Sequence, residues 1–130
     1  MARMGQRVIA IEADAGQGGV GDDAVYAVVG WHPSEAPRAP ADIRGELREL
    51  ARHKKVVALG ETGLDYHHLP SENPGATVVE VERYKWKQSD LFRQHLEVGA
   101  ELGLNCVIHQ RDSLDATLAG LGAQRGERAP

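Results

Sequence analysis

Four short runs of apolar residues constrain the fold more than any other feature of the sequence. The runs are Val8–Ile11, Val25–Val29, Val56–Leu59 and Cys106–Ile108. None of them alternates apolar with polar residues. Continuous Val/Ile-rich runs of this length are typical of strands that are buried on both faces, as in parallel sheets. The sequence therefore predicts four parallel strands.

Helical patterns separate the later runs. Apolar residues recur with helical spacing from Asp42 to Leu50, from about Tyr84 to Leu102 and from about Ser113 to Leu121. This alternation predicts an α/β fold of parallel βα units. The first crossover, residues 12–24, is glycine-rich, lacks a helical pattern and is barely long enough to join parallel strands. We expect a single domain in residues 1–130, with an ordered core at 8–122 and a frayed tail at 123–130.

Composition and charge narrow the functional classes. The 130 residues suffice for one small domain, and the net charge of −4 gives no general basic field that would favour tight non-specific binding of nucleic acid. The single cysteine, Cys106, excludes an internal disulfide and fits a reducing compartment. The run at Val8–Ile11 is too short for a signal sequence or a membrane span. These features predict a soluble, cytoplasmic protein without a membrane partner.

Titratable residues directly follow the apolar runs. In a parallel sheet the carboxyl ends of all strands lie at one edge, which is where the active sites of α/β folds are found. We therefore expect these side chains to meet in one shared pocket, and the glycines beside them to let the backbone turn sharply. The candidate residues are His32, Glu61, Asp65, His109, Arg111 and Asp112.

Each candidate also has a structural explanation when it is taken alone. Glu61 could cap a local turn or pair with Arg111, and His109 could be a hydrogen-bonded core histidine. Asp65 and Asp112 have the residue type that caps turns and helices. The convergence of carboxylate, imidazole and guanidinium groups at one sheet edge instead favours a site for a divalent metal and an anionic substrate.

Three sequence strings make a more specific comparison possible. VYAVVGWHPSEA, VVALGETGLDYH and VIHQRDS occur in the order seen in the TatD-type metal-dependent deoxyribonucleases, which the chain resembles over about residues 8–120. The resemblance implies a TIM-type (β/α)₈ barrel related to amidohydrolases. It also implies one or two divalent metal ions, Mg, Mn or Zn, that activate water against a phosphodiester bond of DNA. Because such a barrel needs ~250 residues, this chain would carry about half of it, by count strands two to five.

The same resemblance implies a role for each candidate residue. Glu61 matches a metal-bridging carboxylate and His109 matches a metal-binding histidine. His32 and Arg111 match residues that bind substrate, and Asp65 and Asp112 match residues with catalytic or supporting roles around the metal. Their chemistry agrees with these roles, because carboxylates offset the charge of a cation and a guanidinium can hold a phosphate oxygen.

The chain also departs from the family pattern. The family opens with a strand that ends in His-x-His, and it has a later histidine and a final aspartate that this sequence lacks. We therefore expect a truncated hydrolase with weak or no activity alone. The alternative is a non-catalytic half-barrel remnant that serves as an interaction module or pseudoenzyme; an unrelated phosphate-binding α/β domain fits the strings less well. Half a barrel would leave open strand edges, which predicts self-association.

Overall fold

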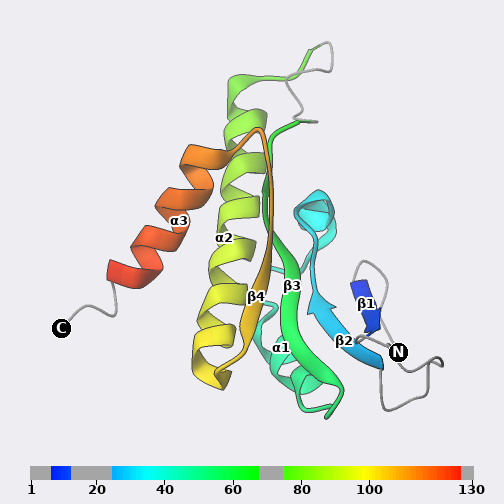
Figure 1. Ribbon diagram of the computed structural model, residues 1–130. Coiled ribbons are helices and arrows are strands. Elements are labelled where there is room, and N and C mark those ends of the chain that lie inside the picture. The colour runs from blue at the N-terminus through cyan, green and yellow to red at the C-terminus, as the bar shows by residue number, and fades with distance from the viewer. Residues whose placement is uncertain (1–6, 13–24, 68–74, 127–130) are drawn as a thin grey trace.

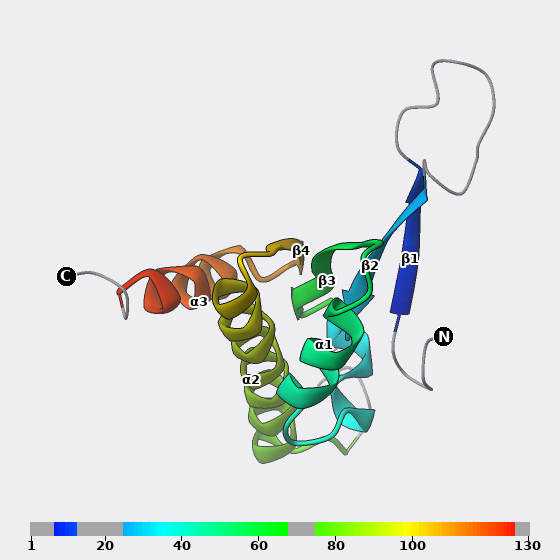
Figure 2. The same ribbon diagram turned by 90° about the horizontal axis from the view of Figure 1, so that it is seen from below.

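The protein folds as a curved β-sheet with its α-helices gathered on one face. The computed structural model describes residues 7–12, 25–67 and 75–126. Figure 2 shows the three α-helices around one face of the sheet, while the opposite face carries no α-helix among these residues. In chain order the elements are β1 (Arg7–Glu12), β2 (Val25–Gly30), the 3₁₀ helix η2 (Pro33–Arg38), α1 (Arg44–Ala51), β3 (Val56–Asp65), α2 (Val78–Leu102), β4 (Asn105–Arg111) and α3 (Leu114–Gly126).

The sheet has the strand order β1-β2-β3-β4, and its last three strands are parallel (Figure 1). Helix α1 joins β2 to β3, and α2 joins β3 to β4, so each crossover returns over the same face of the sheet. This arrangement confirms the predicted α/β class and is consistent with part of a TIM-type barrel. The carboxyl ends of β2, β3 and β4 consequently lie at one edge.

The prediction of four parallel strands is wrong for the first strand. β1 pairs antiparallel with β2, with Arg7 opposite Gly30 and Glu12 opposite Val25. A parallel connection must travel back along the full strand and usually contains a helix, whereas antiparallel neighbours need only a reversal of the chain. The short, glycine-rich connection between the two runs is suited to a reversal. The expected crossover itself, residues 13–24, lies outside the described residues.

Helix α2 is the longest element and has strong signals at both ends. Thr77 accepts a hydrogen bond from the backbone N–H of Glu80, and the Glu80 carboxylate accepts one from the N–H of Thr77, which forms a capping box. Gly103 ends the helix with φ of 69°. The helix begins before the predicted start at Tyr84. Its first turn, with Val78 and Val79, is exposed and has no buried apolar face, so periodicity could not reveal it.

The core lies between the sheet and the helices. It is formed by apolar side chains from β2, η2, α1, β3 and α2, and Trp31 connects the end of β2 to this cluster. Gly30 permits the close approach of α2, because a Cβ there would lie 2.8 Å from Nε2 of His95. The remaining members of the cluster are Val29, Ala36, Ala39, Ile43, Leu47, Leu59, Leu91 and Val98. The loop that follows β2 is therefore held directly against α2. Among the described helices, none has the length and apolarity to cross a membrane.

We expect the chain of residues 1–130 to self-associate. In the described part of the sheet β4 pairs only with β3, and Val107 and Ile108 on it are 39% and 36% exposed. Leu114 and Leu118, one turn apart on α3, are 56% and 57% exposed. An open strand edge beside exposed apolar groups favours pairing with another chain. Light scattering should report dimers or larger species, and a monodisperse monomer with a cooperative unfolding transition in calorimetry would contradict this expectation.

Candidate functional site

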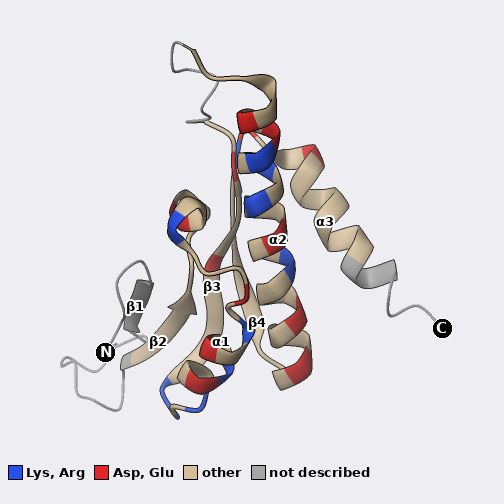
Figure 3. Ribbon diagram, turned by 180° about the vertical axis from the view of Figure 1, so that it is seen from behind, with Lys and Arg blue, Asp and Glu red and all other residues tan. Residues whose placement is uncertain are grey.

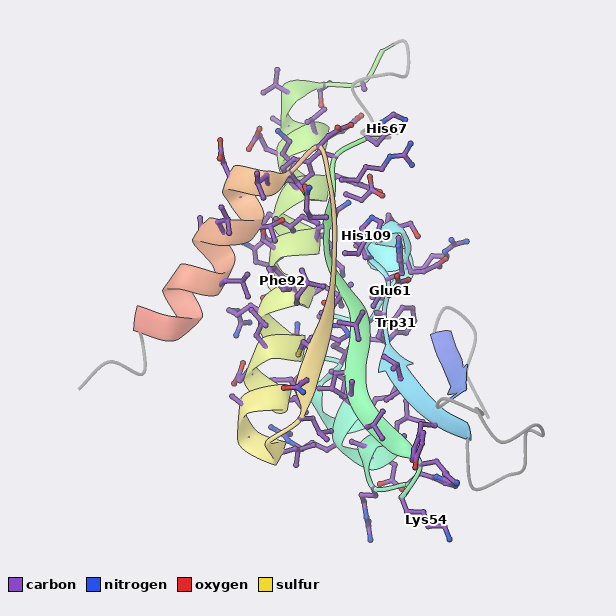
Figure 4. All side chains as sticks on the ribbon, viewed as in Figure 1. Trp31, Lys54, Glu61, His67, Phe92 and His109 are labelled. Atoms are coloured by element: carbon purple, nitrogen blue, oxygen red, sulfur yellow. The ribbon has the colours of Figure 1, made fainter. Side chains whose placement is uncertain are left out.

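The parallel pairing of β3 and β4 brings four of the predicted residues onto one face, namely Glu61, Asp65, His109 and Arg111. Gly63 lies opposite His109 and Asp65 lies opposite Arg111, so these side chains share a face through the period-two alternation of the strands. The intervening residues Thr62 and Leu64 are 0% and 1% exposed and point toward the helices. Figure 4 shows Glu61 and His109 on the side of the sheet away from α2.

A bulge in β3 directs Glu61 to this face. Gly60 pairs with Val107 and Thr62 pairs with Ile108, so Glu61 is an extra residue without a partner position in β4. Gly60 has φ of 149°, and a Cβ there would lie 2.7 Å from the carbonyl oxygen of Val107. Only glycine fits this backbone. Bulges re-aim single side chains beside active sites, which explains why the glycine precedes the carboxylate.

Asp65 orients the imidazole ring of His109. Nε2 of His109 lies 2.9 Å from Oδ2 of Asp65, and both side chains are largely buried. When Nε2 of the neutral ring donates to this carboxylate, Nδ1 carries the lone pair. Burial raises the pKa of Asp65, but hydrogen bonds from the His67 N–H and from His109 outweigh it, so the pKa lies below its usual value. A carboxylate that fixes the tautomer of a histidine is the usual support of a metal ligand.

His32 lies against His109. The centroids of the two rings are 4.5 Å apart with a tilt of 59°. The backbone N–H of Ser34 donates to Nδ1 of His32 over 3.1 Å, so this nitrogen carries no proton. In the neutral ring the proton therefore resides on Nε2, which is then a hydrogen-bond donor. This tautomer can donate to an anionic oxygen, and the substrate role of His32 stays a prediction.

Arg111 and Asp112 lie at the outer rim of the site. Both residues are exposed, and Asp112 has a positive φ of 55°. Oδ2 of Asp112 lies 2.9 Å from Nδ1 of His67, a histidine that the sequence analysis did not single out. Asp112 therefore contacts another loop at the strand ends, whereas Asp65 contacts His109 itself. The structure thus separates two carboxylates that the sequence analysis grouped together.

Two polar residues of α2 also support the site and were missed from sequence. Gln88 is fully buried and holds the backbone of Asp65 from both sides, accepting from its N–H over 2.9 Å and donating to its carbonyl over 3.0 Å. His95 is also fully buried and accepts the backbone N–H of Trp31, next to His32, at Nε2 over 3.0 Å. Both residues lie on the apolar stripe of the helix. A polar residue at such a buried position must be hydrogen-bonded, and this is the sequence signal that could have identified them.

We expect His95 to make stability fall at acid pH. Burial lowers its pKa from about 6.5 to about 4. Between these two pH values the unfolded chain binds the proton and the folded chain does not. The contribution of His95 to the free energy of unfolding is therefore fully present above pH ~6.5 and is lost as the pH falls toward 4. The loss is on the order of 3 kcal/mol. Urea unfolding at pH 7 and pH 4 should show this loss in the wild type and much less of it in His95→Gln. His53→Gln, at an exposed position, is the control that should keep the loss; equal pH dependence in all three proteins would contradict the assignment.

The donor set fits part of a divalent-metal site. Glu61 offers carboxylate oxygens and His109 offers a neutral imidazole nitrogen, both of which suit Zn, Mn or Mg to different degrees. Within the described residues, no group of three or more His, Cys, Asp or Glu side chains is placed to hold a metal ion. These residues therefore supply two protein ligands at most to a complete centre, which usually has three.

Three parallel strands with outer helices, and acidic and imidazole groups at their carboxyl ends, form an α/β arrangement consistent with part of a TIM-type barrel. Residues 17–129 match the sequence model of the family described as TatD related DNase, and the chain belongs to this family. The match begins after β1, so the strand that pairs antiparallel lies outside the family region. The family region is thus shifted toward the C-terminus relative to the expected residues 8–120.

Curated relatives support the same family. The uncharacterized metal-dependent hydrolase YabD of Bacillus subtilis is 33% identical over 105 residues, which are 81% of this chain and 36% of the relative. The uncharacterized metal-dependent hydrolase YcfH of Escherichia coli (strain K12) is 36% identical over 80% of this chain and 34% of its own length. A protein of Erwinia billingiae named 3'-5' ssDNA/RNA exonuclease TatD is 33% identical over 74% of this chain and 32% of its length. The chain spans about a third of the length of these relatives.

Proposed function

We propose that this chain carries one part of the active site of a metal-dependent hydrolase that cleaves phosphodiester bonds of DNA. The observation that carries the proposal is the pair of His109 and Asp65, with Nε2 and Oδ2 at 2.9 Å, on the face that Glu61 also reaches. A carboxylate-supported imidazole beside a second carboxylate is the arrangement that metal hydrolases use to hold their cation. The family membership supports the same chemistry.

In this proposal Glu61 and His109 hold one or two divalent ions, Mg, Mn or Zn. A bound divalent ion lowers the pKa of a water molecule and polarises the phosphate. Asp65 keeps the proton of His109 on Nε2, so Nδ1 remains a ligand atom. Asp65 itself is held at its backbone by Gln88, which fixes the position of the carboxylate relative to β4. The expected support role of Asp65 therefore remains part of the proposal.

The remaining predicted residues would bind and orient the substrate. His32 presents Nε2–H beside His109 and can donate to a phosphate oxygen. Arg111 lies directly opposite Asp65 in the pairing of β3 and β4, on the same face, where its guanidinium can contact a second phosphate oxygen. Asp112 pairs with His67 at the rim and orders the loop ends around the substrate. DNA as the substrate is favoured by the relative named as an ssDNA/RNA exonuclease.

The second candidate function is a non-catalytic half-barrel that serves as an interaction module. It is favoured by the same absence of a group of three metal-binding side chains within the described residues. The test that separates the two functions is metal-dependent cleavage of single-stranded DNA, measured with residues 1–130 alone and with a longer polypeptide that supplies the rest of a barrel. Cleavage by the longer polypeptide that requires Glu61 would support the hydrolase, and its absence would favour the interaction module.

A further inference from the structure

We propose that a pocket between η2 and α2 binds the single-stranded nucleic acid where it continues beyond the site at the strand ends. This inference rests on the proposed function, because it assumes that a phosphodiester chain reaches that site. The η2–α2 pocket has a volume of about 360 Å³, within the range of small-molecule sites. It is lined by Pro37, Glu80, Arg83, Tyr84 and Lys87.

Both walls of the pocket are connected to site residues. Pro37 belongs to η2, and the residue that caps η2 at its N-terminus is His32. On the other wall, Lys87 directly precedes Gln88, which holds the backbone of Asp65. The two segments that fix His32 and Asp65 therefore also contribute residues to the pocket. The proposal is that a strand bound at the strand ends extends to this pocket.

The helical wall presents its polar groups on a single face. Glu80, Arg83, Tyr84 and Lys87 stand at positions i, i+3, i+4 and i+7 of α2, which is the spacing of one helix face. Figure 3 shows Lys and Arg residues along this end of α2. The carboxylate of the group, Glu80, lies at the first turn, where it takes part in the capping box. The part of the pocket nearer the site is therefore cationic.

The cations of the pocket are available for an anionic ligand. Within the described residues, neither Arg83 nor Lys87 takes part in an ion pair. By contrast, arginines elsewhere on α1 and α2 are bound to carboxylates: Arg44 to Glu97, Arg48 to Glu101 and Arg93 to Asp90. Two cations at adjacent turns match the successive phosphates of a nucleic acid backbone.

Aromatic groups are interleaved with these cations. The sequence of the segment is Arg83-Tyr84-Lys85-Trp86-Lys87, and Trp86 is 65% exposed. Nζ of Lys85 lies 4.9 Å from the ring centroid of Tyr66, which follows Asp65. Exposed aromatic rings stack with bases of any sequence, and cations beside them hold the backbone. Tyr84 is the aromatic residue that lines the pocket, and it is half-buried there. We expect its ring to stack with a base, which would distinguish a nucleic acid strand from an acidic peptide.

The experiment measures binding without catalysis. Fluorescence anisotropy of a labelled 12-nucleotide oligothymidine is followed with the 130-residue chain in EDTA and low salt, so that no metal contributes. We expect Lys87→Glu to weaken binding about tenfold or more and to reduce the salt dependence. Lys54→Glu is the matched control, because it makes the same charge change at an exposed position at the opposite end of β3 (Figure 4). The control should change binding less than about twofold.

A second pair of variants tests the aromatic contact. Tyr84→Ala should weaken binding about fivefold or more, while Tyr84→Phe keeps the ring and should bind as the wild type does. Circular dichroism of each variant confirms that the helices remain folded. The proposal would be overturned if the wild type did not bind, if Lys87→Glu and Lys54→Glu weakened binding equally, or if Tyr84→Ala left binding unchanged. It would also be overturned if polyglutamate competed as well as unlabelled oligothymidine. Because binding is measured with the wild type in EDTA, where no metal-dependent cleavage takes place, intact binding together with absent cleavage by the longer polypeptide would count against the proposed hydrolysis and not against this pocket.

Discussion

We expect Glu61→Ala to lower metal-dependent cleavage of single-stranded DNA by about 10³-fold in a polypeptide that joins this chain to the remaining barrel segments of a relative. The expected loss corresponds to ~4 kcal/mol of transition-state stabilisation, the scale of a metal centre that no longer holds its ion. His109→Ala should have an effect of the same size. Cleavage of a labelled oligonucleotide with Mg²⁺, Mn²⁺ or Zn²⁺ is the measurement.

Residues 1–130 alone should show little or no cleavage under the same conditions. The described residues offer Glu61 and His109 as ligands, and two protein ligands hold a divalent ion weakly. Asp65 supports His109 but is already hydrogen-bonded to it through Oδ2. The ion would therefore be absent from most molecules at ordinary metal concentrations.

A carboxylate outside the site provides the control. Glu49→Ala removes an exposed acidic group of α1 and should leave the cleavage rate of the longer polypeptide unchanged. Robust turnover by residues 1–130 alone that disappears in Glu61→Ala would show that three parallel strands suffice for catalysis. Unchanged turnover by the longer polypeptide in Glu61→Ala would remove Glu61 from the metal centre.

The second large effect is structural. We expect Gly63→Ala to destabilise the fold by at least about 3 kcal/mol, because it combines backbone strain with overpacking. Gly63 has φ of 138°, and a Cβ there would overlap the backbone carbonyl oxygen of His109. The obstructing atom belongs to the main chain of the neighbouring strand, so no side-chain rotation can relieve the contact. The strands would have to separate at the position that holds His109.

The measurement is the urea midpoint of each protein, followed by circular dichroism. Gly45→Ala is the matched control, because it lies in α1 with no atom within 4 Å of the added Cβ. Its expected effect has the opposite sign, a gain of about 0.4–1 kcal/mol from reduced freedom of the unfolded chain. Equal midpoints for Gly63→Ala and the wild type would show that β3 and β4 do not approach as closely as described.

The strands were predictable from sequence because their apolar runs are continuous, but the direction of the first was not. Val8–Ile11 is a continuous apolar run like the three parallel ones, and apolar character does not encode strand direction. The glycine-rich connection after it held the relevant information, since its sequence lacks the helical pattern that a parallel crossover usually has. The start of α2 was missed for a related reason: Thr77 caps the helix through hydrogen bonds, which leave no apolar periodicity.

The sequence predicted that the candidate residues meet at one sheet edge, but it did not predict the hydrogen bonds between them. Glu61, His109 and Asp65 all follow apolar runs, so topology alone places them at one edge. The hydrogen bond between Asp65 and His109 depends on the register of β3 and β4, and the bulge at Glu61 changes that register within the strand. Such detail arises from backbone pairing across the sheet, which a single sequence does not specify.

The polar side chains of α2 make the loops at the strand ends mechanically dependent on one another. His95 binds the backbone of Trp31, Gln94 binds that of Ile43 and Gln88 binds that of Asp65. The single helix α2 therefore anchors three segments that are distant in sequence. We therefore expect a displacement of α2 to disturb the segment after β2 and the end of β3 together. A substitution in α2 far from any reacting atom would then affect both halves of the candidate site at once.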